Sequence, residues 1–385
     1  MKKIVLAGAS SIYGIEAIRE TILALGIDII FVETEKMMQY VDEKDCAIQK
    51  TNHLELPSEC VYIPLNEYWV SYGYGHGIMK VSDRAYLCGR SKKFFSKLLM
   101  NHGIDVCKCL TGTDIVNYVT NENCSVLIKP DSYYSGHGVK VVDKDNLDKM
   151  DFYWNEAKTL SDEAKSVLAV NAGKAELWEY IHGDEYSADV FVYEGSCHIL
   201  RLCMKKVVLI EAAPCTVAYI TVSIPMKIEN AIYRWINVLF DDTDISFAQF
   251  DFIVTQEQER IVPIDFACRV GGGMREMFKL YENNIYLEAL KSMIKTENSS
   301  RQNEEGIYQY NILPKRTGKI VNDHYGFFKG TMMKIKKCGD FVKSVEPSAN
   351  NRLGVVVGRH YDEQCFQQDM KNLVLGEGYI TDIIV

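Results

Sequence analysis

The stretch FAQFDFIVTQEQERIVPIDFACRVGGG, from Phe247 to Gly273, has the pattern of two strands joined by a polar turn at 255–260. Asp251 is on the first strand and Asp265 on the second, so the two acids are expected to face each other across a hairpin. Opposite residues of an antiparallel pair have Cβ atoms about 4.5–5.5 Å apart, where like charges repel. A hard divalent cation such as Mg²⁺, bound through carboxylates and phosphate oxygens, would relieve that repulsion. The alternative is a surface hairpin whose acids are solvated.

The two-residue period of a strand predicts which neighbours share a face with the acids. Those neighbours are apolar or small, with one amide: Phe247, Gln249 and Ile253 beside Asp251, and Ile261, Pro263 and Ala267 beside Asp265. Arg269 follows on the same face if the second strand continues, and a glycine run comes after it.

Composition excludes several classes of protein. The chain has 385 residues, which suggests two or three domains, and a net charge of −9, which argues against binding nucleic acid or an anionic membrane. No apolar run approaches the roughly 20 residues of a membrane span. The start, MKKIVLAGAS, is interpreted as a strand rather than a signal peptide.

Twelve cysteines are scattered without a CxxC pair, which favours free thiols in a reducing cytoplasm over a disulfide framework.

The N-terminal pattern predicts a β-α-β unit: a strand at 3–8, a glycine turn at 8–14, a helix at 15–25 and a strand at 27–32. The turn, GASSIYG, has no GxGxxG fingerprint, so a half-Rossmann unit is favoured over a dinucleotide site. An NAD-linked oxidoreductase remains an alternative.

Further elements follow from periodicity and capping residues. Ser91 is expected to cap a helix starting at Lys92, with an apolar stripe of Phe94, Phe95, Leu98 and Leu99 and a stop at Gly103. Strands are expected at 125–129, 138–142, 175–181 and 185–193, helices at 229–239 and 281–294, and a linker at 296–306.

Two lysines have the setting of anion-binding residues. Lys129 ends a strand before a loop in which Gly136 and Gly138 would let backbone amides approach an anion. Lys92 lies in the first turn of its helix, where the helix dipole disfavours a cation, and this hints at an anionic partner. The alternative for both is a solvated surface lysine.

The segment WEYIHGDEYS, from Trp178 to Ser187, predicts a strand, a tight turn and a second strand. Free backbone groups at the end of the first strand could bind a purine edge, and Glu185 could accept from ribose hydroxyls. A plain hairpin is the alternative.

Together these pieces resemble the ATP-grasp superfamily, by their order and spacing from about Lys92 to Gly273. The resemblance implies an α/β (α+β) ATP-grasp fold with an N-terminal half-Rossmann (pre-ATP-grasp) domain at 1–90, a catalytic domain at 91–300 and a small β-rich lobe at 301–385.

The resemblance also implies roles for residues. Ser132 to Gly138 would be the lid over the phosphates, and Asp251 and Asp265 the Mg²⁺ ligands. Arg269 and Lys129 would be catalytic. The nucleotide would contact Lys92, Leu127, Lys129, Ser135, Gly136, His137, Gly138, Trp178, Glu179, Tyr180, Ile181, Glu185 and Ile253.

The chain departs from the family pattern in the metal site. Ala267 stands where the family usually has an asparagine as third ligand, and Cys268 where a proline is usual. The second acid is the shorter aspartate, and Tyr133 and Tyr134 lie within the lid. Both acids and both lysines remain, so an active enzyme is favoured.

The implied function is that of an ATP-dependent carboxylate–amine ligase, which activates an amino acid or small acid as an acylphosphate and uses ATP and Mg²⁺ as cofactors. The resemblance also implies that the protein could form a homodimer. Its partners would be small acid and amine substrates. Cations near the expected cleft are candidate substrate contacts: Arg201, Lys205, Lys206 and Arg275. The alternatives are a carboxylase or carbamoyl-phosphate-type relative and a nucleotide-binding protein without ligase turnover.

Overall fold

A computed structural model of the chain describes residues 3–41, 47–57, 59–110, 115–120, 124–130, 136–168, 175–256, 260–295, 304–314, 317–323, 330–343, 352–368 and 381–384. Within these ranges no helix has the length and apolar character needed to cross a bilayer. Every cysteine in these ranges is a free thiol.

The N-terminal region forms a parallel sheet in the order β3-β2-β1-β4. Its strands are β1 (Lys3–Ala7), β2 (Asp28–Glu33), β3 (Ile48–Lys50) and β4 (Cys60–Pro64), and α1 (Ile15–Ala24) connects β1 to β2. This confirms the expected β-α-β unit. Ile4 and Leu6 pack into one hydrophobic cluster and Val5 and Ala7 into another, so both faces of the sheet are buried.

The largest sheet has the order β12-β11-β8-β9-β10-β13-β17-β15. Its strands are β8 (Asp184–Tyr193), β9 (Ser196–Ile210), β10 (Ala213–Thr221), β11 (Ile245–Val254), β12 (Ile261–Ala267), β13 (Tyr308–Ile312), β15 (Thr331–Lys334) and β17 (Gly354–Gly358). Strands from the last part of the chain therefore extend the sheet that carries the acidic hairpin.

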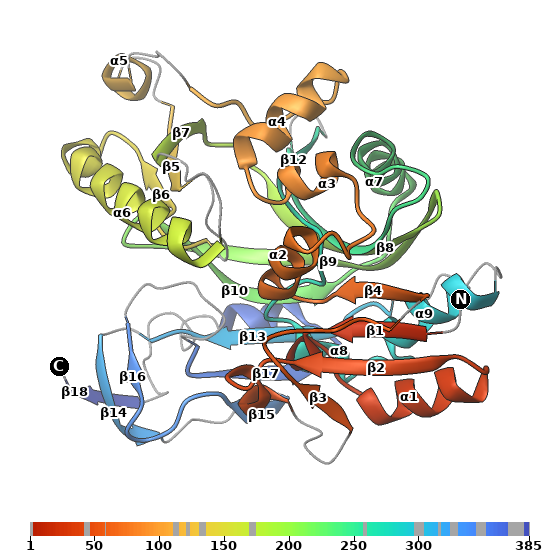
Figure 1. The fold of residues 1–385 in the computed structure, drawn as a ribbon. Helices are drawn as coiled ribbons and strands as arrows, with labels where there is room; N and C mark the ends of the chain where they lie inside the picture. Colours follow the sequence, from red (N-terminus) through yellow and green to blue (C-terminus); the bar gives the residue numbers. More distant parts are fainter. Residues whose placement is uncertain are drawn as a thin grey trace.

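Two smaller sheets, of three strands each, also occur in the described ranges. One has the order β6-β5-β7, from β5 (Val126–Pro130), β6 (Lys140–Val142) and β7 (Ala175–Glu179), and Figure 1 shows α6 (Met150–Leu168) lying against it at the upper left. The other has the order β16-β14-β18, from β14 (Gly318–Asp323), β16 (Phe341–Val342) and β18 (Thr381–Ile384).

Other α-helices in the described ranges include α2 (Glu67–Gly75), α3 (Asp83–Cys88), α4 (Lys92–Asn101), α5 (Ile115–Thr120), α7 (Met226–Leu239), α8 (Arg275–Phe278) and α9 (Ile285–Lys295), and 3₁₀ turns occur at Ala9–Ser11, Met37–Tyr40 and Leu147–Lys149. Ser91 caps α4 as expected, since its hydroxyl accepts from the amide of Phe94 at 3.1 Å. Phe95 and Leu99 are buried, but Phe94 is 39% exposed, so its place in the apolar stripe was wrong. Successive residues of an α-helix are rotated by about 100°, so Phe94, one position before Phe95, lies to the side of the face that Phe95 and Leu99 bury.

The chain thus has a mixed α/β architecture, as expected. The expected linker at 296–306 lies mostly outside the described residues, as do residues 132–135 of the expected lid and the centre of the hairpin turn.

Candidate active site

Asp251 and Asp265 lie directly opposite each other in the antiparallel ladder of β11 and β12, as the sequence predicts. The register then shifts at a β-bulge, so that Phe252 pairs with Pro263 and Ile264 is the extra residue. Because of this bulge, the prediction that Ile261 and Pro263 share a face with Asp265 was wrong. Ile261 packs instead into the hydrophobic cluster behind the hairpin, and Ile264 lines the cavity beside Asp265.

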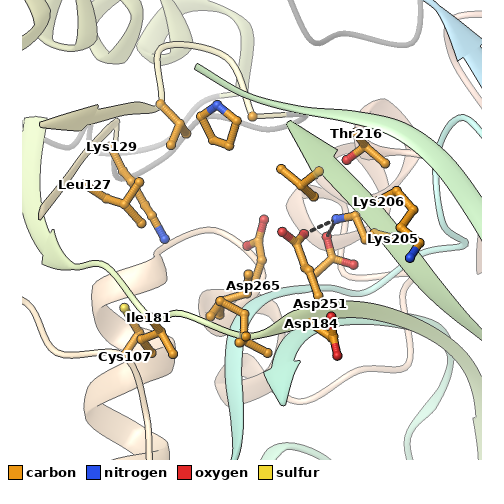
Figure 2. A pocket seen from close by; sticks show the side chains of 18 of the residues that line it. Cys107, Leu127, Lys129, Ile181, Asp184, Lys205, Lys206, Thr216, Asp251 and Asp265 are labelled. Carbon is orange, nitrogen blue, oxygen red and sulfur yellow. Dashed lines mark hydrogen bonds and ion pairs between the residues drawn. The ribbon is translucent and has the colours of Figure 1, made fainter. Parts of the chain in front are cut away.

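A cavity of about 540 Å³ opens over this hairpin. Its lining includes most of the residues expected at the nucleotide and metal sites, namely Lys92, Leu127, Lys129, Gly136, His137, Glu179, Tyr180, Ile181, Glu185, Asp251, Ile253, Asp265 and Arg269. Figure 2 shows Leu127 and Lys129 on one side, with Lys205 and the two aspartates across from them. The fold therefore brings together side chains from β5, β8, β9, β11, β12 and α4.

Lys205 connects two of the acids. Its amine donates to a carboxylate oxygen of Glu185 and, at 3.0 Å, to Oδ2 of Asp251, as the dashed lines in Figure 2 show. Burial alone would lower the pKa of Lys205, but Asp251 and Glu185 hold it above its ordinary value. Burial likewise acts to raise the pKa of Asp251, and Lys205 outweighs that effect and lowers it. The sequence had suggested Lys205 only as a substrate contact.

The two expected nucleotide lysines differ in their surroundings. Lys92 lies 3.5 Å from a carboxylate oxygen of Asp265, because α4 begins beside β12. Lys129 is buried, and its amine lies 5.7 Å from the centre of the Trp178 ring. Both lysines line the cavity, so neither is the solvated surface residue of the alternative interpretation.

Glu179, Tyr180 and Ile181 line the cavity. The amide of Glu179 donates to Lys108 O at 3.0 Å and that of Tyr180 to Ser125 O at 3.2 Å, so both are used within the fold. The thiol of Cys107, which also lines the cavity, donates to the carbonyl of Glu179 at 3.4 Å. Burial raises the pKa of that thiol to about 11, so it stays protonated at neutral pH.

Gly183 makes the turn after this segment possible. A Cβ at this position would lie 2.4 Å from the carbonyl oxygen of Val254 and 2.7 Å from Ile253. Only glycine allows this close approach between the turn and the end of β11.

Arg269 is held by a residue that sequence reasoning missed. Its Nε donates to Glu67 at 2.6 Å, and Arg90 donates to the other oxygen of the same carboxylate at 2.6 Å. Burial alone would raise the pKa of Glu67, but Arg269 and Arg90 hold it below its ordinary value. Because Glu67 comes from α2, 202 residues before Arg269 in the chain, no local pattern could identify it.

Two expected substrate contacts lie elsewhere. Arg201 is 0% exposed and paired with Asp189 at 2.8 Å, where it supports the fold beneath the glycine run rather than the cleft. Arg275 donates to Ser10 O at 2.9 Å and to Tyr40 O at 2.6 Å, so it holds the N-terminal region. Both expectations were therefore wrong. Lys206 does line the cavity and lies 3.2 Å from Glu363.

Three expected nucleotide contacts are not among the lining residues. Trp178 is buried in the small sheet, where it pairs with Leu127. Gly138 has a φ of 68°, and a Cβ there would meet Leu160 and Pro130, so this glycine serves the turn. Ser135 lies outside the described residues.

The N-terminal glycine turn is occupied by a side chain of the protein itself. Glu33, fully buried at the end of β2, accepts from the amide and hydroxyl of Ser10 and from the indole nitrogen of Trp69. In a dinucleotide site an acid at such a strand end would hold a ribose hydroxyl. This arrangement therefore argues against the NAD-linked alternative.

The acidic pair suits a magnesium ion. Among the residues that the structure describes, no cluster of three or more His, Cys, Asp or Glu side chains could hold a metal alone. Mg²⁺ is characteristically bound through one or two carboxylates together with phosphate oxygens and water. Two aspartates facing each other on the wall of a cavity fit that requirement.

The chain was compared with protein-family models and with solved structures, and both comparisons find similar proteins. Residues 122–277 match the family model described as an ATP-grasp domain. The fold resembles that of L-amino acid ligase from Bacillus licheniformis, with a TM-score of 0.63 and 13% identity over 100% of this chain and 99% of that one. It also resembles biotin carboxylase from Campylobacter jejuni, with a TM-score of 0.58 and 15% identity over 100% and 92%.

A third similar structure is N5-carboxyaminoimidazole synthase from Aspergillus clavatus in complex with ADP and 5-aminoimidazole ribonucleotide, with a TM-score of 0.60 and 11% identity over 97% and 98%. No curated protein sequence matches the chain. The domain match and the shared fold confirm the resemblance drawn from the sequence: the protein carries an ATP-grasp domain.

Proposed function

We propose that the protein is an ATP-dependent carboxylate–amine ligase that forms a carbon–nitrogen bond and releases ADP and phosphate. The observation that carries the proposal is the facing pair Asp251 and Asp265 in a cavity that also contains Lys92 and Lys129. We also propose that the chain is divided into the three expected domains, an N-terminal domain at 1–90, a catalytic domain at 91–300 and a C-terminal lobe at 301–385.

The nucleotide base would lie between Leu127 and Ile253, both lining residues, with its polar edge on the Glu179 carbonyl and the Ile181 amide. Lys129 and Lys92 would contact the phosphates. Gly136, with a φ of 71°, and His137 line the cavity beside Lys129, at the end of the expected lid. Glu185 would accept a hydrogen bond from a ribose hydroxyl once its hydrogen bond with Lys205 is broken.

Asp251 and Asp265 would hold Mg²⁺, which when bound supplies positive charge to the phosphate oxygens and lowers the cost of charge developing during transfer. Arg269 and Lys205 supply further positive charge from the protein side. Because these groups are fixed in place before reaction, catalysis would rest on positioning and electrostatics rather than on a covalent nucleophile.

In the proposed reaction the carboxylate of the acid attacks the γ-phosphorus of ATP, giving an acylphosphate and ADP. The amine then attacks the acyl carbon, phosphate leaves, and the amine gives up a proton. Exclusion of water from the cavity would protect the acylphosphate from hydrolysis.

A nucleotide-binding protein without turnover is the second candidate. Ala267 favours it, because no amide is available at that position as a third metal ligand. The carboxylase alternative has no comparable support from a particular residue.

The discriminating experiment is a matrix of small acids and amines with ADP release as readout. The proposed function predicts that at least one acid and amine pair stimulates ADP release from MgATP. Tight binding of ADP with no stimulation by any pair would favour the second candidate.

A further inference from the structure

Two buried cations line the cavity without a carboxylate partner among the described residues. They are Lys129, which is 7% exposed, and Arg352, which is 5% exposed. The other lining cations, Lys92, Lys205, Lys206 and Arg269, each lie within 4.0 Å of an acid. A buried charge without a counter-charge is costly, so each of the two marks a place where an anion would be stabilised.

Lys129 lies at the end of the cavity where the triphosphate is proposed to bind, and phosphates would neutralise it. Arg352 comes from the start of the segment that leads into β17, more than 200 residues later in the chain. It was not anticipated from the sequence, and the proposed nucleotide contacts leave it without an anion.

Neutral groups hold the Arg352 side chain in place. Its Nη1 donates to the carbonyl of Gly273 at 2.6 Å, and its guanidinium carbon lies 5.8 Å from the centre of the Tyr219 ring. Burial lowers the pKa of Arg352, and an arginine nevertheless remains charged at neutral pH. Its orientation is therefore fixed while its charge is left uncompensated.

Among the described residues, Arg352 forms no ion pair with Asp251 or Asp265. Tyr219 is the cross-strand neighbour of Lys205 in the ladder of β9 and β10, and both line the cavity. Lys205 contacts Asp251, whereas Arg352 contacts Tyr219 and the glycine run. The two cations thus serve different parts of one cavity.

The glycine run leaves room beside Arg352. Gly272 lines the cavity, and a Cβ built there would meet no atom within 4 Å. The strands β9 and β10 supply a mainly apolar wall to the same cavity through Val207, Leu209 and Pro214. A small organic anion could therefore approach the guanidinium along the backbone of the glycine run.

We propose that Arg352 binds a carboxylate that does not react, carried by one of the two substrates of the ligase. This inference rests on the proposed function. The carboxylate that is activated loses its negative charge when it becomes an acylphosphate and then an amide. A buried arginine keeps its charge throughout, so only an anion that persists through the reaction keeps it paired.

The substrate class is accordingly a dicarboxylic acid, or an amine that itself bears a carboxylate. Two matched pairs of probes separate these sources: succinate against propionate as the acid, and glycine against glycinamide as the amine. The wild-type protein should prefer the carboxylate-bearing member of at least one pair in kcat/KM for ADP release.

The Arg352→Gln variant should lose about ten- to a hundredfold in kcat/KM for that preferred member, the range for a charge-assisted hydrogen bond, and keep its rate with the other member. The Arg352→Lys variant should retain part of the preference, because it keeps the charge. Affinity for MgADP should stay unchanged in both variants.

Failure of this inference is distinct from failure of the proposed function. If no pair releases ADP, the ligase proposal fails, and calorimetric binding of succinate and glycine in the presence of MgADP still tests Arg352. Equal use or binding of both members of each pair by the wild type, or an equal loss for both members in Arg352→Gln, overturns the inference. If Arg352→Gln unfolds, the comparison rests on Arg352→Lys and on Gly272→Ala.

Discussion

Gln249 lies directly opposite Ala267 in the ladder of β11 and β12, and its amide nitrogen lies 3.1 Å from Oδ1 of Asp251. Its amide oxygen accepts from Arg269 at 2.7 Å. One side-chain amide therefore joins a proposed metal ligand to the arginine, across the ladder from the position where an asparagine is missing.

We predict that Gln249→Ala weakens the protein's response to Mg²⁺. Loss of a hydrogen bond to a charged group costs about 1.5–3 kcal/mol, which corresponds to roughly ten- to a hundredfold in apparent magnesium affinity. The measurement is Mn²⁺ binding in the presence of ATP, followed by electron paramagnetic resonance. The double variant Gln249→Ala, Ala267→Asn should recover part of the loss, and unchanged Mn²⁺ binding in Gln249→Ala would contradict the role given to this amide.

Lys129→Ala should weaken ATP binding by about tenfold or more, because it removes a buried charge that lies near the proposed phosphates. Calorimetric titration with ATP provides the measurement. Lys144, an exposed lysine shortly after β6, supplies the matched control, and Lys144→Ala should bind ATP as the wild type does. Equal affinities in both variants would remove Lys129 from the nucleotide site.

Gly272→Ala should impair use of the acid or amine without affecting stability. Its Cβ would enter open space in the cavity, and Gly272 has no positive φ that would strain an alanine. Gly75, on α2, has the same open surroundings outside the cavity, so Gly75→Ala is the control. We expect a raised KM for a substrate only in Gly272→Ala, with both melting temperatures near that of the wild type. A normal KM would place the substrate away from the glycine run.

The pair of arginines on Glu67 should make stability depend on pH in the acid range. The pKa of Glu67 is lowered from 4.5 in the folded state, so its contribution is fully present above that value. It is lost as pH falls through the lower folded-state pKa. Glu67→Gln should destabilise the protein by about 3–5 kcal/mol at neutral pH, since it takes this carboxylate from the buried Arg90 and from Arg269, whose side chain is 15% exposed.

Denaturant unfolding at several pH values tests this prediction. The difference between wild type and Glu67→Gln should shrink as pH falls below about 4.5. A difference that does not change with pH would show that the carboxylate charge of Glu67 contributes nothing to stability.

The sequence could predict what depends on local order. The hairpin of Asp251 and Asp265, the cap at Ser91 and the β-α-β unit are set by strand period, a capping hydroxyl and glycine stops, and all three are present. The resemblance placed Lys92 and Lys129 in a common cleft, and both line the cavity.

The sequence could not predict contacts between distant segments. Because of a one-residue β-bulge, Ile264 lines the cavity. The alternation of side chains along a strand, with its period of two residues, does not predict where such a bulge occurs. Arg201 was expected in the cleft only because it is a cation near that cleft in the expected fold. Its partner Asp189 on β8 holds it in the core instead, and that pairing depends on register rather than on residue type.

We propose that the facing aspartates, Asp251 and Asp265, serve the ATP-dependent activation of an acid. The most direct measurement is ADP release from MgATP by wild type and Asp265→Asn across the matrix of acids and amines, with circular dichroism to verify the fold. We expect stimulated release by the wild type and none by a folded Asp265→Asn. Full activity in that variant would contradict this proposal.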